Sequence, residues 1–208
     1  MDLAAWVERM RELQATARPV PRQPVLTAEQ TDPALGDAVR RVATSPNSGN
    51  HVAAALAYYR AGVLDIAQDH LAEAVRLDRS DAAAYDLRAR IWRDWGLPGM
   101  GLGDAYRAVY YAPESPEARN TLGTMFLRLG QIAEARSAYA RATELDDRAA
   151  YAWSNLCHVS ALEGDLAAGE RACRRALALD PAFAPARRNL ERIHILMAAA
   201  ATSAEGRQ

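Results

Sequence analysis

Four glycines recur at a constant interval along the chain. They stand 34 residues apart, at Gly62, Gly96, Gly130 and Gly164. Twelve residues after each glycine comes an alanine, at Ala74, Ala108, Ala142 and Ala176. A small residue also follows each glycine by five positions, at Ala67, Gly101, Ala135 and Gly169. Since all three columns keep one phase, the chain is expected to fold as an array of repeated units, each packing on its neighbours.

The pattern within each repeat predicts two short helices. In the third repeat, the apolar residues of the first segment follow the i, i+3, i+4, i+7 spacing of a helix face, at Leu122, Met125, Phe126 and Leu129. Gly130 should end this helix, because glycine adopts the left-handed conformation past a helix C-terminus at low cost. The second segment is rich in small residues, which lets two helix backbones approach closely. The sequence therefore predicts an all-α protein built from helical hairpins.

These columns resemble the tetratricopeptide repeat (TPR), a 34-residue helical hairpin. The third unit carries the family pattern at Leu122, Gly123, Phe126, Gly130, Ala135, Tyr139 and Ala142. The fourth unit carries it at Trp153, Leu156, Gly164, Ala176 and Pro181, with cysteines at the family's glycine and second-helix aromatic positions. The resemblance implies a right-handed α-α superhelical solenoid of four hairpins with capping helices. We place the four units at residues 48–81, 82–115, 116–149 and 150–183.

Both ends of the array should be covered by capping elements, since terminal repeats leave one side unpacked. At the C-terminus, residues 184–200 fit a capping helix whose Leu190, Ile193 and Met197 face the fourth unit, followed by a tail at 201–208. Ile195 and Leu196 are expected to stay exposed. Residues 1–47 should contain an amphipathic helix, a proline-rich linker and a second short helix that Asp32-Pro33 opens and that caps the array.

The first N-terminal helix has an apolar stripe whose contacts the sequence leaves open. The stripe consists of Leu3, Trp6, Val7, Met10 and Leu13. It could fold back on the array, pair with a second copy, or dock into the groove of a partner. Its polar face mixes acidic and basic residues, which speaks against binding to a membrane surface.

The composition and the missing motifs exclude several kinds of chemistry. The formal net charge is −1, which disfavours nucleic acid as a partner. All 25 basic residues are arginines, so no lysine is present for a Schiff base or a phosphate-binding loop. The glycine-rich run 96–103 follows a predicted helix rather than a strand, so a nucleotide site is not expected there. No metal-binding or nucleophile motif is found, and we expect neither an enzyme nor a cofactor.

The two cysteines and the search for targeting segments bear on the cellular location of the protein. Cys157 and Cys173 lie in one hairpin and are expected to be two small buried hydrophobic residues, since two cysteines do not make a disulfide framework. No signal peptide or transmembrane segment is recognised, so a cytoplasmic protein without membrane insertion is expected.

The family resemblance also implies a functional surface, because the first helices of TPR units line a concave groove. The groove positions carried onto this chain are Val52, Leu56, Tyr59, Asp86, Arg90, Arg93, Asn120, Thr124, Leu127, Arg128, Ser154, Asn155, His158, Arg188 and Arg192. They change from apolar, through polar, to arginine-bearing residues. Val52 and Leu56 stand where the chaperone-binding subclass has a basic residue and an asparagine, which disfavours a chaperone tail as the ligand.

The predicted function is therefore a protein–protein interaction scaffold. It would bind a peptide or partner helix, with the arginines favouring an acidic one, as a subunit or assembly factor of a larger complex. The alternative is a structural subunit that self-associates through its N-terminal helix into a homo-oligomer. A nucleic-acid binder is a third, weaker reading.

Overall fold

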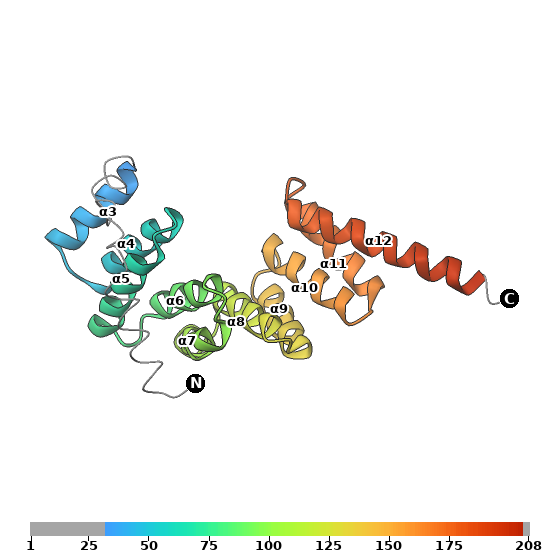
Figure 1. The fold of residues 1–208 in the computed structure, drawn as a ribbon, viewed down its shortest axis with the longest axis horizontal. Helices are drawn as coiled ribbons and strands as arrows, with labels where there is room; N and C mark the ends of the chain where they lie inside the picture. The colour runs from blue at the N-terminus through green and yellow to red at the C-terminus, as the bar shows by residue number, and fades with distance from the viewer. Residues whose placement is uncertain (1–31, 206–208) are drawn as a thin grey trace, which may run out of the picture.

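The computed structural model describes residues 32–205, which form ten helices and no strand. The helices are α3 Pro33–Thr44, α4 Ser48–Arg60, α5 Leu64–Leu77, α6 Ala82–Asp94, α7 Pro98–Tyr111, α8 Pro116–Arg128, α9 Ile132–Leu145, α10 Ala150–Leu162, α11 Leu166–Leu179 and α12 Ala184–Glu205. The array is curved, with α3–α5 and α10–α12 on either side of α6–α9 (Figure 1). The predicted all-α superhelical repeat fold is confirmed.

Each hairpin turns at one of the four periodic glycines. All four have positive φ, with values of 76°, 76°, 76° and 84° along the chain. In the first hairpin, the backbone N–H of Val63 donates to the carbonyl of Tyr58 at 2.9 Å, and that of Gly62 donates to Tyr59 at 3.1 Å. These bonds satisfy carbonyls at the end of α4 that have no partner within the helix. The predicted left-handed glycines are thus confirmed, and they explain the constant period.

One pair of equivalent positions, one on each helix, recurs in the interior of every hairpin. The pairs are Ala55 and Leu71, Ala89 and Ala105, Gly123 and Tyr139, and Cys157 and Cys173. In the third hairpin, a Cβ on Gly123 would lie 2.8 Å from the ring of Tyr139, so the glycine makes room for the aromatic side chain. The residue on one helix therefore has to match the size of its partner on the other.

In the fourth hairpin this pair is a disulfide, and the expectation of two unlinked buried cysteines was wrong. The Sγ atoms of Cys157 and Cys173 are bonded at 2.05 Å, with the Cα atoms 5.2 Å apart. Both side chains are fully buried. The two positions correspond to Gly123 and Tyr139, which touch in the third hairpin, so the fold itself brings the two thiols within bonding distance.

Residues 98–103 of the glycine-rich run in the second repeat are helical and belong to α7, which follows the turn at Gly96. Pro98 occupies the first turn of this helix, as predicted. A Cβ on Gly101 would lie only 2.9 Å from the carbonyl oxygen of Ala89 on α6. Gly101 is therefore required for the close approach of α6 and α7, and the run is a packing device rather than a phosphate-binding loop.

The ends of the array are covered by α3 and α12. Asp32 caps α3 by accepting the backbone N–H of Ala34 at 2.9 Å. On α12, Ile193 is buried while Ile195 and Leu196 are 69% and 40% exposed, as expected. This helix continues to Glu205, beyond the predicted end at 200. The N-terminal stripe of Leu3, Trp6, Val7, Met10 and Leu13 lies outside the described residues. No helix of the described part is both long and apolar enough to cross a bilayer.

Two histidines contact each other inside the first hairpin. The Nδ1 atoms of His51 on α4 and His70 on α5 are 3.1 Å apart, which allows a hydrogen bond only when one ring nitrogen lacks a proton. His70 also stacks on Tyr58, with ring centroids 5.4 Å apart. Burial, together with the neighbouring His51, lowers the pKa of His70 below its ordinary value of 6.5.

Acidification is therefore expected to destabilise the first hairpin. The unfolded chain protonates His70 near pH 6.5, whereas the folded chain does so only at a lower pH. The contribution of neutral His70 to stability is present above pH 6.5 and is lost as the pH falls toward the folded pKa. Urea unfolding should show a lower midpoint at pH 5.5 than at pH 7.5. His158, whose pKa is also lowered, acts with the same sign.

A His70→Ala variant isolates this effect, because Ala138 and Ala172 occupy the equivalent position in later hairpins. The variant should retain the part of the pH response due to His158 and lose the rest. If the difference in urea midpoint between pH 5.5 and pH 7.5 were unchanged in this variant, His70 would be excluded as a source of the pH response.

Candidate functional site

The first helices of the hairpins form one wall of the array. Along the described chain, α4 contacts α6, α6 contacts α8, α8 contacts α10 and α10 contacts α12. Positions 34 residues apart therefore line up across these helices. One row holds Val52, Asp86, Asn120, Ser154 and Arg188, and a second row holds Leu56, Arg90, Thr124, His158 and Arg192. These two rows contain most of the residues predicted to line the groove.

A cavity of about 380 Å³ lies at the N-terminal end of this wall, between α4, α6 and α8. It brings together four predicted site residues, Val52, Leu56, Asp86 and Arg90. Further lining residues, which the sequence analysis missed, are Ala82, Ala83, Leu87, Ala112, Ser115, Glu117 and Ala118. Three of these lie on α6, two in the turn between α7 and α8, and two in the first turn of α8, so the cavity extends beyond the two rows of aligned positions.

The carboxylate of Asp86 is only weakly compensated in this cavity. Its side chain is 16% exposed, and its nearest cation is the guanidinium of Arg90, with Nη1 3.8 Å from Oδ2. The other oxygen, Oδ1, is buried and has no hydrogen-bond partner among the described residues. Burial raises the pKa of Asp86 above its ordinary value, against the opposing influence of Thr121 and Arg90.

The two predicted groove arginines on α6, Arg90 and Arg93, already have partners within the array. The guanidinium of Arg90 lies over the ring of Tyr59, 5.0 Å from its centroid. Arg93 donates from Nε to Asp94 at 2.7 Å and from Nη2 to the Tyr59 hydroxyl at 3.1 Å. The hydroxyl of Tyr59 in turn donates to Asp94 at 2.7 Å. Tyr59 and these arginines thus tie α4 to α6, which leaves them less able to receive an acidic ligand than the sequence suggested.

The centre of the wall is polar. Asn155 donates from Nδ2 to Oδ1 of Asn120 at 2.7 Å, joining α10 to α8. Thr124 accepts the hydroxyl of Tyr139 at 3.1 Å. Leu127 packs against the apolar cluster around Tyr139. The side chain of Arg128 is exposed.

Ser154 does not belong to the accessible groove. It is only 1% exposed, and Nδ2 of Asn189 on α12 donates to its backbone carbonyl at 3.3 Å. The prediction that it lines the groove was wrong, because α12 packs over this end of α10.

The C-terminal end of the wall is cationic. Arg188 and Arg192 on α12 are exposed and form no ion pair within the described range 32–200. Burial and the neighbouring Arg192 lower the pKa of His158. The wall therefore runs from an apolar cavity with a buried carboxylate, through amides, to two unpaired arginines.

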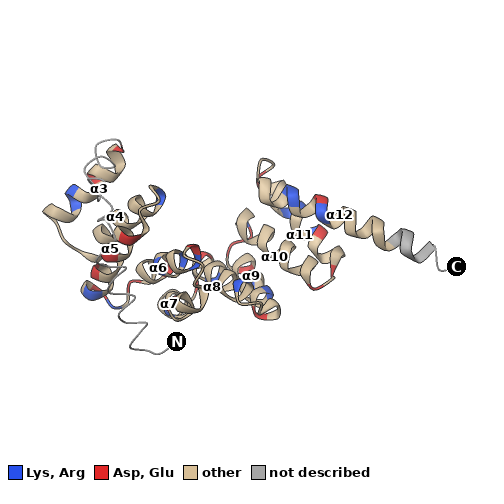
Figure 2. Cartoon of the chain, in the orientation of Figure 1, with Lys and Arg blue, Asp and Glu red and all other residues tan. Residues whose placement is uncertain are grey.

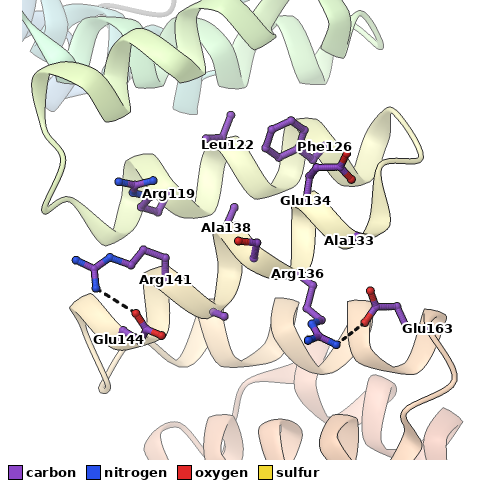
Figure 3. A pocket seen from close by; sticks show the side chains of 12 residues that line it. Arg119, Leu122, Phe126, Ala133, Glu134, Arg136, Ala138, Arg141, Glu144 and Glu163 are labelled. Carbon is purple, nitrogen blue, oxygen red and sulfur yellow. Dashed lines mark hydrogen bonds and ion pairs between the residues drawn. The ribbon is translucent and has the colours of Figure 1, made fainter.

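A second and wider depression, of about 980 Å³, is formed by α8, α9 and Glu163. Figure 3 shows that its charged side chains are largely paired with each other. Arg136 donates to Glu163 at 3.0 Å, and Arg141 donates to Glu144 at 3.1 Å. Arg119 and Glu134 also line the depression outside these pairs, and Nε of Arg119 is buried without a hydrogen-bond partner among the described residues. The smaller cavity is the better candidate site because it contains four of the predicted groove residues and a weakly compensated carboxylate.

Charges of both signs are interspersed along the array (Figure 2). No basic stripe of the kind that follows a nucleic-acid backbone stands out in that view. Within the described part of the chain, no group of three or more His, Cys, Asp or Glu residues could hold a metal ion.

Comparison with known proteins places this fold. The tetratricopeptide repeat family model matches residues 116–148. A thermophilic TPR protein of Thermus thermophilus, TTC0263, is 22% identical, with a TM-score of 0.65, over 72% of this chain and 82% of its own. No curated protein matches the chain significantly.

Two further solved structures are of proteins described with peptides. YrrB, described as a TPR protein with an unusual peptide-binding site, is 20% identical, with a TM-score of 0.59, over 88% of this chain and 96% of its own. The first TPR of Spaghetti (RPAP3), bound to an HSP90 peptide, is 19% identical, with a TM-score of 0.55, over 58% of this chain and 96% of its own. The repeat family is matched at residues 116–148, and the same hairpin recurs at four left-handed glycines, so the chain has the fold of a tetratricopeptide-repeat solenoid.

Proposed function

We propose that this protein is a scaffold that binds an extended peptide or a partner helix along the wall of first helices, as part of a larger complex. The observation that carries the proposal is the cavity of about 380 Å³ built on the predicted positions Val52, Leu56, Asp86 and Arg90. Peptide binding by the similar YrrB and Spaghetti structures supports the same use of the fold. Catalysis is not part of the proposal.

The polar centre of the wall suits a peptide backbone. Each amide side chain has one acceptor oxygen and two donor hydrogens. The single bond between Asn120 and Asn155 leaves further capacity on both side chains. They can therefore pair with the C=O and N–H groups of a ligand whatever its side chains are, while the cavity and the arginines at the two ends select particular side chains.

Peptides selected from a random displayed library against the full chain would test the proposal. Their binding sites can be mapped by NMR shift changes. We expect the changes to cluster on Val52, Leu56, Asn120 and Asn155. Changes confined to α7 or to the exposed end of α12 would contradict the groove.

Replacing both Asn120 and Asn155 by alanine should weaken such a peptide about tenfold or more, since two backbone hydrogen bonds of roughly 0.5–1.5 kcal/mol each are lost. Calorimetric titration measures the change. Met100→Ala is the matched control, because Met100 is 63% exposed on α7, away from the wall, and its loss should leave the affinity unchanged.

Self-association through the N-terminal helix is the alternative function. It rests on the apolar stripe of Leu3, Trp6, Val7, Met10 and Leu13, which lies outside the described residues. Solution mass before and after deletion of residues 1–24 separates the two functions. A change from oligomer to monomer would favour self-association, whereas an unchanged monomer that still binds selected peptides would favour the groove.

The cytoplasmic location expected from the sequence stays a prediction, and the disulfide argues against it. Structural disulfides are rare where cellular thiols are kept reduced. Because Cys157 and Cys173 form such a bond, we favour an oxidising compartment for this protein.

A further inference from the structure

The cavity between α4, α6 and α8 has apolar walls and an acidic end. The partly buried side chains of Val52 and Leu56 and the buried Leu87 provide apolar surface. Its ionisable lining groups are Asp86, Glu117 and Arg90, two carboxylates and one guanidinium. Among these lining residues, the carboxylates outnumber the guanidinium groups by one.

Arg90 does not supply the missing compensation for Asp86. It approaches Oδ2 only to 3.8 Å, beyond hydrogen-bond distance, because its guanidinium lies over the ring of Tyr59. The buried Oδ1 accepts no hydrogen bond from the described residues. A carboxylate in this state is stabilised by any cation that enters the cavity, since burial weakens the competing solvation by water.

Glu117 is held at the rim of the same cavity. Its Oε2 accepts the hydroxyl of Ser115 at 3.0 Å, and its Oε1 accepts the hydroxyl of Tyr151 at 3.4 Å. Both bonds come from hydroxyl groups, so they orient the carboxylate without neutralising its charge. Asp86 and Glu117 thus come from adjacent first helices and act on the same cavity.

We propose that this cavity receives a basic side chain, lysine or arginine, from the segment that lies in the groove. The methylene stem packs against the apolar wall, and the charged head faces Asp86 and Glu117. This inference rests on the proposed function and names the side-chain class that the N-terminal end of the groove selects. With Arg188 and Arg192 unpaired at the other end, the groove carries opposite charges at its two ends, which fixes the direction of the bound segment.

An acidic side chain is the less favourable occupant of this cavity. It would face two carboxylates, and the guanidinium that lines the cavity, that of Arg90, lies over the ring of Tyr59. An uncharged apolar side chain fits the walls but leaves the charge of Asp86 uncompensated. The cavity should therefore rank cationic above neutral, and neutral above anionic ligands of equal length.

Three small probes of matched length test this order on the full chain: pentylammonium, pentan-1-ol and pentanoate. Methyl NMR shifts of Val52, Leu56 and Leu87 report binding even when it is weak. We expect pentylammonium to bind at least tenfold more tightly than pentanoate, with pentanol between them. In Asp86→Asn, which keeps the size of the side chain, pentylammonium should lose its advantage over pentanol.

Glu117→Gln provides a second variant at an exposed position, should Asp86→Asn perturb the fold. It should reduce the preference for the cation while leaving the affinity for pentanol unchanged. Equal binding of the three probes, or tighter binding of pentanoate, would overturn the charge assignment. So would the absence of any shift at the three methyl-bearing residues. None of these results bears on whether selected peptides bind along the wall, so the proposed function is judged separately.

Discussion

Replacing Asp104 by alanine is expected to lower the free energy of unfolding by about 3–5 kcal/mol, the usual result of removing one partner from a buried ion pair. Asp104 on α7 is only 5% exposed. It accepts two hydrogen bonds from Arg88 on α6, from Nε and from Nη2, each at 2.7 Å. Arg107 adds a weaker contact at 3.3 Å. Without the carboxylate, the guanidinium of Arg88, whose side chain is 19% exposed, is left largely buried and unpaired.

The double variant Arg88→Leu, Asp104→Ala is the matched control. The third hairpin has Leu122 and Ala138 at these two positions, and the fourth has Leu156 and Ala172. The apolar pair thus already fits this hairpin geometry. We expect the double variant to regain most of the lost stability and to lie within about 1 kcal/mol of the unmodified protein, because a buried ion pair is often no more stabilising than an apolar pair of similar volume.

Hydrogen exchange resolved by residue is the suitable measurement, since repeat arrays can unfold in parts rather than in one step. Loss of protection in the single variant should centre on α6 and α7. If the double variant were as unstable as the single one, the loss of stability would not arise from the unpaired guanidinium of Arg88.

The sequence predicted the fold well because each repeat forms most of its contacts within itself and with its immediate neighbours. A period of 34 residues fixes where each hairpin turns, and the positive φ of Gly130 follows from its place after a helix. The same period aligns Val52, Asp86 and Asn120 across successive first helices. Reading one column at a time was enough to locate the wall and four residues of its cavity.

The features that the sequence analysis missed depend on two columns together. Cys157 and Cys173 belong to different columns, and their bond follows only from the contact that these columns make inside a hairpin. Arg93 was expected to face a ligand, but its side chain bonds to Asp94 and Tyr59, a choice that spacing along the chain does not determine. The burial of Ser154 depends on how closely α12 covers α10. This contact is made by the last helix, whose packing the 34-residue repeat does not determine.

Reduction of the Cys157–Cys173 disulfide is expected to cost about 3 kcal/mol of stability in the fourth hairpin. The bond joins residues separated by 16 positions, and a loop of about this length gives roughly that value from the lost constraint on the unfolded chain. Urea unfolding with and without reductant, followed by helicity, measures the difference. Hydrogen exchange should place the loss in α10 and α11.

Cys157→Ala with Cys173→Leu separates the cross-link from the packing. It copies Ala55 and Leu71, the fully buried pair at these positions in the first hairpin. The stability of this variant should not change with reductant. It should equal or slightly exceed that of the reduced unmodified protein, because the apolar pair fills the space without closing the loop.

Cys157→Ser with Cys173→Ser buries two hydroxyl groups instead and should be the least stable form. If reductant left the unfolding of the unmodified protein unchanged, the bond would contribute nothing to stability. The argument for an oxidising compartment would then lose its support, because a fold that is equally stable without the disulfide does not depend on an oxidising environment.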